Sequence, residues 1–300
     1  MNAPVQGSSL WQDAWRRLKR NRVALVSGVV VLAIGVFCVL GPLVAALFGL
    51  DYASQDIPLG ATAPTLAHPF GTDVLGRDVM VRTMHGGRVS LLVAAVATAV
   101  SLLVGTTYGA ISGFVGGRVD NAMMRFVDLA MSTPYLLLVI VLMALIPPTA
   151  IQVGDLDGSF ILMFAALGLV SWLTLSRIVR GQVLSLKERE FVEAARAIGV
   201  PPLRILFRHI VPNTLGPVIV YSTLTIPSVM LSEAFLSFLG LGIREPQASW
   251  GTLVNDGANA MAVYPWLLAF PGGVMTLTLF CLNFLGDGLR DALDPSASKS

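Results

Sequence analysis

Long apolar runs alternate with short polar segments along the whole chain. Six runs contain no Asp, Glu, Lys or Arg, namely 23–50, 89–117, 129–154, 158–176, 210–232 and 257–286. A helix needs about 20 apolar residues to cross the hydrocarbon layer of a membrane, which is about 30 Å thick. Each run is long enough, if the helix of the fourth run continues to about Arg180. The pattern therefore predicts an all-α, polytopic membrane protein with six transmembrane helices.

Composition supports this class. Of the 300 residues, 55% are hydrophobic and only 13% are charged, whereas a soluble domain has about 25% charged residues. The first run follows a basic segment, as in a secretory signal peptide, but it is longer than the roughly 7–15 apolar residues of such a signal. We expect it to be retained as a span. Cys38 and Cys281 lie within apolar runs, so we expect small buried side chains and no disulfide or metal site.

The distribution of Lys and Arg predicts the orientation of the spans. With six spans, both termini lie on the same side of the membrane. If that side is the cytoplasm, all but four of the 20 Lys and Arg residues fall in cytoplasmic segments, in agreement with the positive-inside rule. The four exceptions are Arg77, Arg82, Arg88 and Arg244. We therefore expect the N- and C-termini to be cytoplasmic.

The apolar runs divide the chain into four parts. We expect residues 1–22 to form a cytoplasmic amphipathic segment, and residues 23–88 to form the first transmembrane helix and a periplasmic segment. Residues 89–287 are expected to form a five-helix core, and residues 288–300 a cytoplasmic tail. The core contains a long polar interruption at about 188–212, which the predicted orientation places in the cytoplasm.

The outer segments contain charged residues at regular spacing. Asp73 and Arg77 are four residues apart, and so are Asp78 and Arg82. Residues at this spacing are neighbours on a helix. We therefore expect the two pairs to lie along a short helix before the second span.

Motifs for several other functions are absent from the sequence. The chain has no GxxxxGK[ST] phosphate loop and no GxSxG serine motif. It has no His, Glu and Asp cluster at metal-ligand spacing, and no basic run with interleaved aromatic residues. We therefore expect no bound cofactor or metal, no enzymatic activity and no nucleic-acid partner.

The polar segment 188–212 is expected to begin with a short amphipathic helix at 188–198. One face of this helix would be apolar, formed by Phe191, Ala194, Ala195 and Ile198. Because the alanines are small, another surface can approach the backbone closely. Gly199 suits a helix C-terminus with positive φ, and Pro201-Pro202 prevents simple continuation of the helix. The segment is therefore expected to turn sharply at this point.

A second apolar face follows the turn. It is formed by Leu203, Leu206, Phe207 and Ile210. We expect residues 203–211 to lie along the membrane surface, and Pro212 to close the segment just before the fifth span. By itself, this pattern also fits an interfacial helix pair in any long inner loop.

The spacing within the segment resembles a family motif. Glu193, Ala194, Ala195, Gly199 and Pro212 match the EAA motif of ABC importer permeases. Other family-like stretches cover almost the whole chain, among them HPFGTDVLGRDVMVRTMHGGRVSLL (68–92) and SWGTLVNDGAN (249–259). Together they resemble the inner-membrane permease subunits of peptide-type ABC importers, and within that family the C-type subunits of oligopeptide permeases.

This resemblance implies a type I ABC-importer permease fold in the bacterial inner (plasma) membrane. It implies ATP-driven uptake of peptides, most closely oligopeptides, along a pathway shared with a homologous permease subunit. Further implied partners are two ATP-binding subunits that bind ATP and Mg²⁺, an external solute-binding protein, membrane lipid and the peptide substrate. The implied ATPase-coupling residues are Glu190, Phe191, Glu193, Ala194, Ala195, Gly199 and Pro212.

Several alternatives stay open at this point. Similar permeases import dipeptides, glutathione or nickel chelates. A secondary transporter usually carries charges at mid-membrane, whereas the six apolar runs contain none, and a membrane scaffold without transport is a third class. Glu233, at the end of the fifth run, would cap a local helix at the outer interface, line the pathway near an outer gate, or pair with the partner permease.

Overall fold

The computed structural model describes residues 10–145 and 158–293 of the chain. Its helices are α1 (Leu10–Arg20), α2 (Arg22–Leu47), α3 (Val79–Val115), α4 (Gly117–Ser132), α5 (Tyr135–Leu145), α6 (Gly158–Leu186), α7 (Glu190–Ala197), α8 (Pro202–Ile205), the π-helical segment η2 (Leu206–Ile210), α9 (Val211–Phe238), α10 (Trp250–Ala260) and α11 (Trp266–Leu293). No β-strand occurs in these residues, which agrees with the predicted all-α class.

Five helices are long and apolar enough to cross a membrane. They are α2, α3, α6, the continuous helix of α8, η2 and α9, and α11. A sixth candidate is the pair of α4 and α5, whose axes differ by 86°. The expectation of six spans agrees with the structure when this bent pair is counted as one span.

The third predicted span, 129–154, is bent close to its start. α4 ends at Ser132, and α5 begins after Pro134. Between them Thr133 has an extended backbone, with φ of −83° and ψ of 134°. Steric contact with the ring of a following proline favours this conformation and disfavours a helical one. The rest of this predicted span, 146–154, lies outside the described residues.

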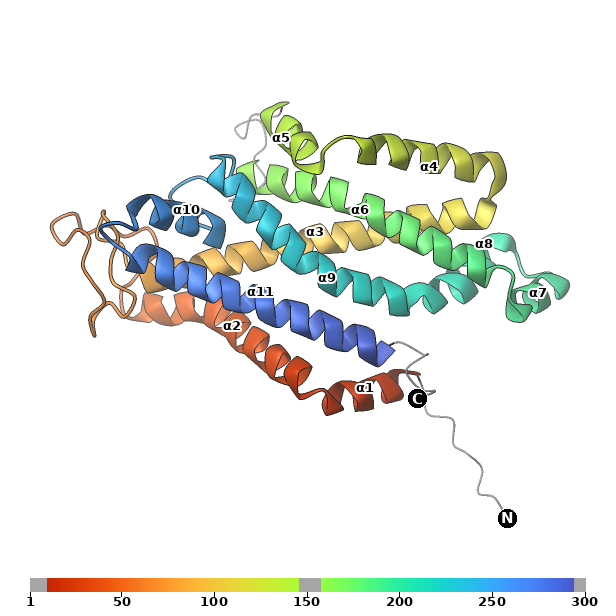
Figure 1. Ribbon diagram of the computed structural model, residues 1–300, viewed down its shortest axis with the longest axis horizontal. Helices are drawn as coiled ribbons and strands as arrows, with labels where there is room; N and C mark the ends of the chain where they lie inside the picture. The colour runs from red at the N-terminus through yellow and green to blue at the C-terminus, as the bar shows by residue number, and fades with distance from the viewer. Residues whose placement is uncertain (1–9, 146–157, 294–300) are drawn as a thin grey trace, which may run out of the picture.

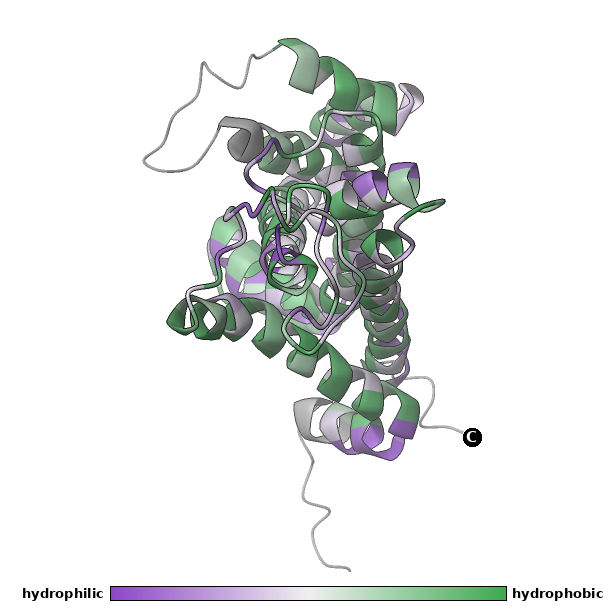
Figure 2. Ribbon diagram, turned by 90° about the vertical axis from the view of Figure 1, so that its left-hand side faces the viewer, coloured by the Kyte–Doolittle hydropathy of each residue, from purple (hydrophilic) through white to green (hydrophobic). Residues whose placement is uncertain are grey.

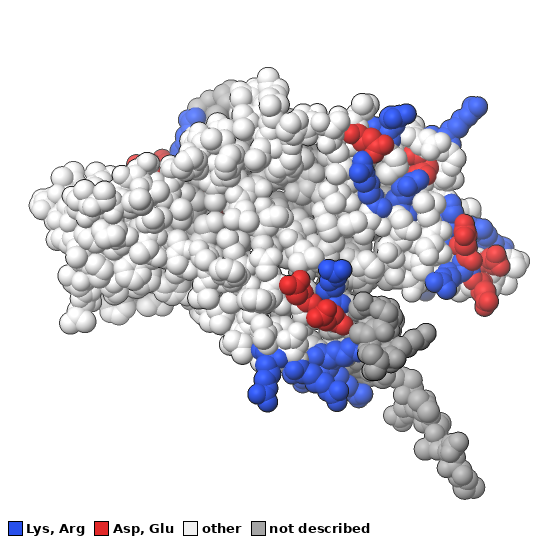
Figure 3. Space-filling view, viewed as in Figure 1, with Lys and Arg blue, Asp and Glu red and all other residues white. Residues whose placement is uncertain are grey.

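The long helices run side by side along the molecule (Figure 1). At one end lie residues 48–78 and α10, which we call the loop end. At the other lie α7 and α8, together with most of the charged side chains visible in Figure 3, which we call the charged end. α1 packs against α11 toward the charged end, as expected for chain ends on one side. That this side is the cytoplasm, and that the chain divides as proposed above, stay predictions.

Most residues of the long helices are hydrophobic (Figure 2). α2 is the most peripheral of them, since few of its residues are buried inside the protein. Its exposed side chains include Leu32, Leu43 and Leu47. Such a surface suits contact with lipid. Cys38 and Cys281 are both buried and unpaired, as predicted.

The closest helix packing joins α3 and α6. Gly105, Gly109 and Gly113 follow one another at intervals of four residues, so they share one face of α3. A Cβ atom at Gly109 would lie 2.2 Å from the main-chain oxygen of Ser176, and one at Gly113 would lie 2.9 Å from that of Arg180. The two backbones therefore approach too closely for any side chain, as small residues permit in membrane helices.

Two ion pairs join α4 to α6 at the charged end. Arg180 donates from Nε and Nη2 to the two carboxylate oxygens of Asp120, each over 2.6 Å. Ser112 of α3 also donates to Asp120, at 2.5 Å, and Arg177 pairs with Asp128. Bidentate guanidinium–carboxylate contacts fix orientation as well as distance. They hold α4 beside α6.

The loop before α3 differs from the short helix that the sequence suggested. Its Asp73–Arg77 pair is confirmed, with 2.6 Å between Oδ2 and Nε, but it forms within a turn. The expected pair of Asp78 with Arg82 is wrong. Asp78 instead accepts a backbone N–H in the first turn of α3 and lies 2.8 Å from Nδ1 of His68. The reason is that an aspartate just before a helix satisfies an otherwise free N–H.

A single methyl group at position 109 is expected to destabilise the protein. In Gly109→Ala, the new Cβ would meet the main-chain oxygen of Ser176, so α3 and α6 must separate. We expect the free energy of unfolding of the purified protein to fall by about 1–3 kcal/mol, the usual cost of overpacking. Gly181→Ala in α6 is the control, since nothing lies within 4 Å of its new Cβ. Equal thermal midpoints for the two variants would contradict the close packing.

Candidate functional site

α7 is a short helix that ends in a Schellman motif. The N–H of Val200 donates to the carbonyl of Ala195, and the N–H of Gly199 to that of Arg196, each over 3.0 Å. Gly199 has φ of 80°, a left-handed conformation that glycine adopts without steric cost. The helix expected at 188–198 and the turn after it are confirmed, with the helix shorter by two residues at its start and one at its end.

One side of α7 is anchored in the protein. Val192 and Ala195 are 0% and 6% exposed, and both belong to a hydrophobic cluster that joins α7 to α3, α6, α8, η2 and α9. The other buried members are Ala110, Leu175, Val179, Val183, Ile205, Leu206, Ile210 and Val218. The cluster therefore joins α7 to three long helices at once.

The other side of α7 presents an exposed apolar surface, which we call the coupling patch. Its members are Phe191, Ile198, Leu203 and Phe207, which are 40%, 80%, 68% and 49% exposed. Ala194 is exposed between them, and Glu190 and Glu193 are exposed beside them. An apolar surface with a charged rim is typical of a protein–protein contact. The members of the patch come from both sides of the Gly199 turn.

The expected single apolar face of α7 is wrong in one residue. Ala195 lies on the anchored side with Val192, while Phe191, Ala194 and Ile198 face outward. Apolar residues cover more than one side of this helix, so the spacing of apolar residues alone does not show which of them are buried. Because Val192 fills the cluster, the alanine next to it on the helix surface is covered too.

The chain after the turn also departs from the sequence prediction. In place of a separate helix along the membrane surface, α8, η2 and α9 form one helix that continues through Pro212. In the π-helical turn, the N–H of Val211 donates to the carbonyl of Leu206, five residues earlier. A wider turn accommodates the ring and the missing N–H of a proline. Pro212 therefore lies within the fifth span and does not end a segment before it.

Glu233 lies near the loop end of α9 and is 1% exposed. Three serine hydroxyls donate to its carboxylate: Ser249 at 2.6 Å, Ser237 at 2.9 Å and Ser90 at 3.1 Å. Ser249 is also the N-cap of α10, and the oxygen of Ser90 accepts the N–H of Trp250 at 3.1 Å. The buried carboxylate therefore fixes the start of α10 against α3 and α9.

This geometry bears on the alternatives for Glu233. A residue that lines a pathway, or that pairs with another subunit, needs an accessible carboxylate. The carboxylate of Glu233 is enclosed by side chains of its own protein. The structure favours the helix-capping alternative, and a role of Glu233 in transport stays a prediction.

A cavity of about 220 Å³ lies between α5, α6 and α9 and is rich in hydroxyl groups. α9 contributes Tyr221, Thr225, Ser228 and Ser232. Several of these hydroxyls donate to carbonyls of their own helix, so the cavity is polar but uncharged. Sequence reasoning missed it, although the intervals of four, three and four residues place these side chains on one helical face.

The structure defines a membrane protein whose apolar helices are long enough to span a bilayer, with exposed apolar side chains at one end and a polar cavity among its helices. Residues 105–299 match the family described as binding-protein-dependent transport system inner membrane component. Residues 9–65 match the N-terminal TM domain of oligopeptide transport permease C. The chain belongs to the family of binding-protein-dependent transport system inner membrane components, which confirms the resemblance found in the sequence.

Individual relatives span nearly the whole chain. The oligopeptide transport system permease proteins OppC of Haemophilus influenzae and Escherichia coli K12 are each 50% identical to it over 97% of its length, and the match covers 90% and 93% of those proteins. The dipeptide transport system permease protein DppC of Bacillus subtilis is 43% identical over 96% of the chain and 86% of that protein.

A solved structure supports the fold. The match to an inward-facing conformation of the MetNI methionine ABC transporter covers 72% of this chain and 97% of that one, with a TM-score of 0.55 and 17% identity. At this identity the likeness concerns the fold alone. The predicted ABC-importer permease fold and the inner-membrane location are confirmed together with the family.

Replacing Glu233 by Gln is expected to loosen α10 without unfolding the bundle. A neutral amide oxygen accepts fewer hydroxyl protons than a carboxylate, so one serine donor loses its partner. We expect amides 250–253 to exchange with deuterium about fivefold faster, which corresponds to about 1 kcal/mol. Glu193→Gln, at an exposed carboxylate of the charged end, is the control. Unchanged exchange in Glu233→Gln would mean that the serine network does not hold α10.

Proposed function

We propose that this chain is the transmembrane permease subunit of an ATP-driven importer of peptides, most closely oligopeptides. The observation that carries this proposal is the two-sided α7 helix, anchored among three long helices and apolar on its exposed side. The relatives at 50% identity are named as oligopeptide permeases, which supports the substrate class. A relative at 43% identity is named for dipeptides, so dipeptides are the first alternative, before glutathione or nickel chelates.

The coupling patch would dock on an ATP-binding subunit at the cytoplasmic face. Phe191, Ala194 and Ile198 enter a cleft of that subunit, while Glu190 and Glu193 contact its rim. Two such subunits bind ATP and Mg²⁺, so the chain itself holds no cofactor and catalyses no reaction. When the two subunits close, α7 is displaced with them. ATP biases the transport cycle only if the contacts of α7 differ between the inward- and outward-facing states.

The pathway would lie between this chain and a homologous permease, with the hydroxyl-rich cavity of α5, α6 and α9 as part of its wall. A peptide importer passes side chains of every charge. Uncharged hydroxyl groups bond to the peptide groups that all substrates share, and they select no side-chain charge. An external solute-binding protein delivers the peptide at the loop end, and lipid surrounds helices such as α2.

The structure supports a secondary transporter less well than an ATP-driven importer. Its coupling ion would need an accessible charge among the spans, and the carboxylate of Glu233 is enclosed by three serines. A membrane scaffold would bind the same partners but move no substrate. Transport measurements separate these classes.

The test is reconstitution of the chain in liposomes with a second permease, two ATP-binding subunits and the solute-binding protein. We expect a labelled short peptide to accumulate only when ATP, the binding protein and this chain are all present. Accumulation that needs no ATP would indicate a secondary transporter. An assembled complex that moves none of the peptides tested would indicate a scaffold.

The turn at Gly199 supplies a sharper prediction. Nothing lies within 4 Å of a Cβ at this position, so φ of 80°, and not crowding, disfavours a side chain. Gly199→Val should assemble normally but lose ATP-driven uptake about five- to thirtyfold, because a left-handed β-branched residue is strained by about 1–2 kcal/mol. Gly199→Asn is the control, since asparagine tolerates this conformation. Full uptake by Gly199→Val would show that the turn does not transmit force.

A further inference from the structure

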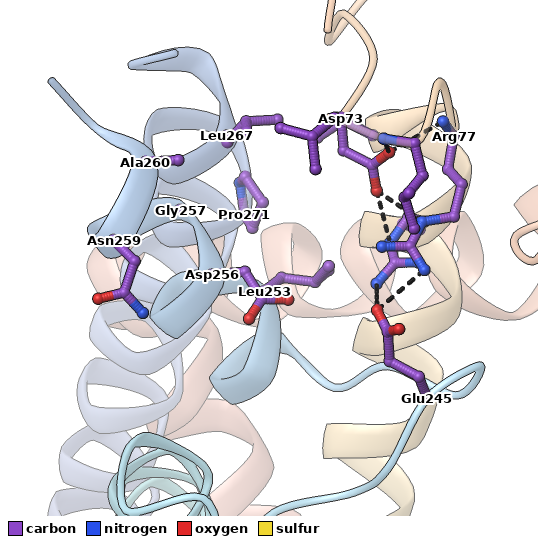
Figure 4. Close-up of a pocket in the computed structure, with 14 residues that line it drawn as sticks. Asp73, Arg77, Glu245, Leu253, Asp256, Gly257, Asn259, Ala260, Leu267 and Pro271 are labelled. Carbon is purple, nitrogen blue, oxygen red and sulfur yellow. Dashed lines mark hydrogen bonds and ion pairs between the residues drawn. The ribbon is translucent and has the colours of Figure 1, made fainter. Parts of the chain in front are cut away.

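A cavity of about 380 Å³ opens at the loop end of the protein (Figure 4). Its wall comes from the loop before α3, the first turn of α3, the loop before α10, and α10 and α11. Figure 4 shows Asp73, Arg77 and Glu245 together on one side, with Asp256 and Asn259 of α10 across from them. Neither the coupling patch nor the hydroxyl-rich cavity includes any of these residues.

Arg82 lines this cavity with an unused hydrogen-bond donor. Its side chain is 3% exposed, and its Nη1 has no hydrogen-bond partner. Its Nε lies 3.8 Å from the carboxylate of Asp73, and its Nη2 lies 3.9 Å from that of Glu245, both beyond hydrogen-bond range. A buried charged donor without a partner is strongly unfavourable. The cavity therefore offers a positive group that an incoming acceptor would satisfy.

The neighbouring Arg77 indicates which acceptor fits. It donates from Nε to Asp73 at 2.6 Å and from Nη1 to Glu245 at 2.9 Å. Burial lowers the pKa of Arg77, but these hydrogen bonds outweigh it and raise the pKa above its ordinary value. Glu245 is 61% exposed on a loop, and one of its oxygens approaches both arginines. Arg77, next to Arg82 in the cavity wall, thus already holds a carboxylate from an exposed loop residue.

The carboxylate of Asp256 disfavours the binding of an anion in the cavity. It is exposed at the cavity, and no ion pair with either arginine forms within the described residues. Burial raises the pKa of its carboxyl, while the charge of Arg82 lowers it. As an anion, Asp256 repels a second carboxylate. Removal of its charge should therefore strengthen the binding of an anion at Arg82.

We propose that this cavity is a binding site for a carboxylate, which bonds to the guanidinium group of Arg82 and replaces Glu245 at Arg77. The planar guanidinium fork matches the two oxygens of a carboxylate, and the low exposure of Arg82 strengthens the contact. Two sources of this group reach the loop end of an importer: the C-terminal carboxylate of a peptide, and an acidic side chain of the solute-binding protein. Since both are partners in the proposed function, the site rests on that function.

The experiment compares variants of the complete complex. One arm measures the affinity of the peptide-free binding protein for the complex in nanodiscs. The other measures KM for uptake of a peptide and of its C-terminal amide. Arg82→Gln should either weaken docking of the binding protein or raise KM for the free peptide, by about tenfold or more. This is the effect of losing a buried charge-assisted hydrogen bond. Asp256→Asn should have the opposite effect in the same arm. Arg244→Gln is the control, an exposed arginine on the same loop as Glu245 but outside the cavity.

The two arms identify the source of the carboxylate. Opposite changes in docking for Arg82→Gln and Asp256→Asn assign it to the binding protein. Opposite changes in KM for the free peptide, absent for the amide, assign it to the substrate. If both arms stay unchanged, or if Arg82→Gln weakens binding and Asp256→Asn does not strengthen it, the site does not hold a carboxylate. Because Asp256 is exposed, its variant keeps the test valid where Arg82→Gln fails to fold.

Failure of the proposed function gives a different result. In that case the wild-type complex takes up no peptide, before any variant is compared. The docking arm still reports on the cavity, because it needs neither ATP nor transport. A change in docking that appears with both Arg82→Gln and the control Arg244→Gln would mean a general effect of surface charge, and would overturn a specific site.

Discussion

The contact between the backbones of α3 and α6 is the constraint on which the rest of the structure depends. At Gly109 the two chains approach so closely that a methyl group would lie 2.2 Å from a main-chain oxygen. α6 leads into α7, and α3 contributes Ala110 to the cluster that anchors α7. α3 has 37 residues, and it begins at the Arg82 cavity. One rigid pair therefore connects the docking surface at one end with the arginine cavity at the other.

The buried polar groups of this protein fall into two kinds. Glu233 receives three hydroxyl donors, and Asp120 receives both arms of Arg180 together with a serine. In an apolar surrounding such satisfied groups stabilise one arrangement of the helices. Arg82 differs, because it is just as buried but keeps a free donor beside an open cavity. The satisfied groups explain the fold. Among the described residues, Arg82, Thr98 and Ser101 each have a buried side-chain atom without a hydrogen-bond partner; Arg82 is the charged one of the three, and it points to a ligand.

The sequence predicts those parts of the molecule that local chemistry decides. The spans follow from apolar length, and the end of α7 follows from Gly199 and the prolines after it, because helix termination is a local property. The partners of Glu233 were not predictable, since Ser90 lies in α3 and Ser249 before α10. The same holds for Asp78, which could pair with Arg82 by spacing but caps α3 and meets His68 in the folded loop. Contacts between distant segments determine the partners of Glu233 and Asp78, and the spacing of residues along the sequence does not predict such contacts.

The continuous helix through Pro212 changes how a displacement of α7 reaches the membrane. A separate helix along the surface would convert it into a sideways pull at the start of the fifth span. In the structure Leu206 and Ile210 are buried in the cluster with Val192, and they belong to the π-helical turn of the span itself. If α7 moves as proposed, its displacement therefore acts directly on the end of that helix. π-helical turns occur often at functional sites. The turn before Pro212 therefore lies where the proposed displacement of α7 would enter the fifth span.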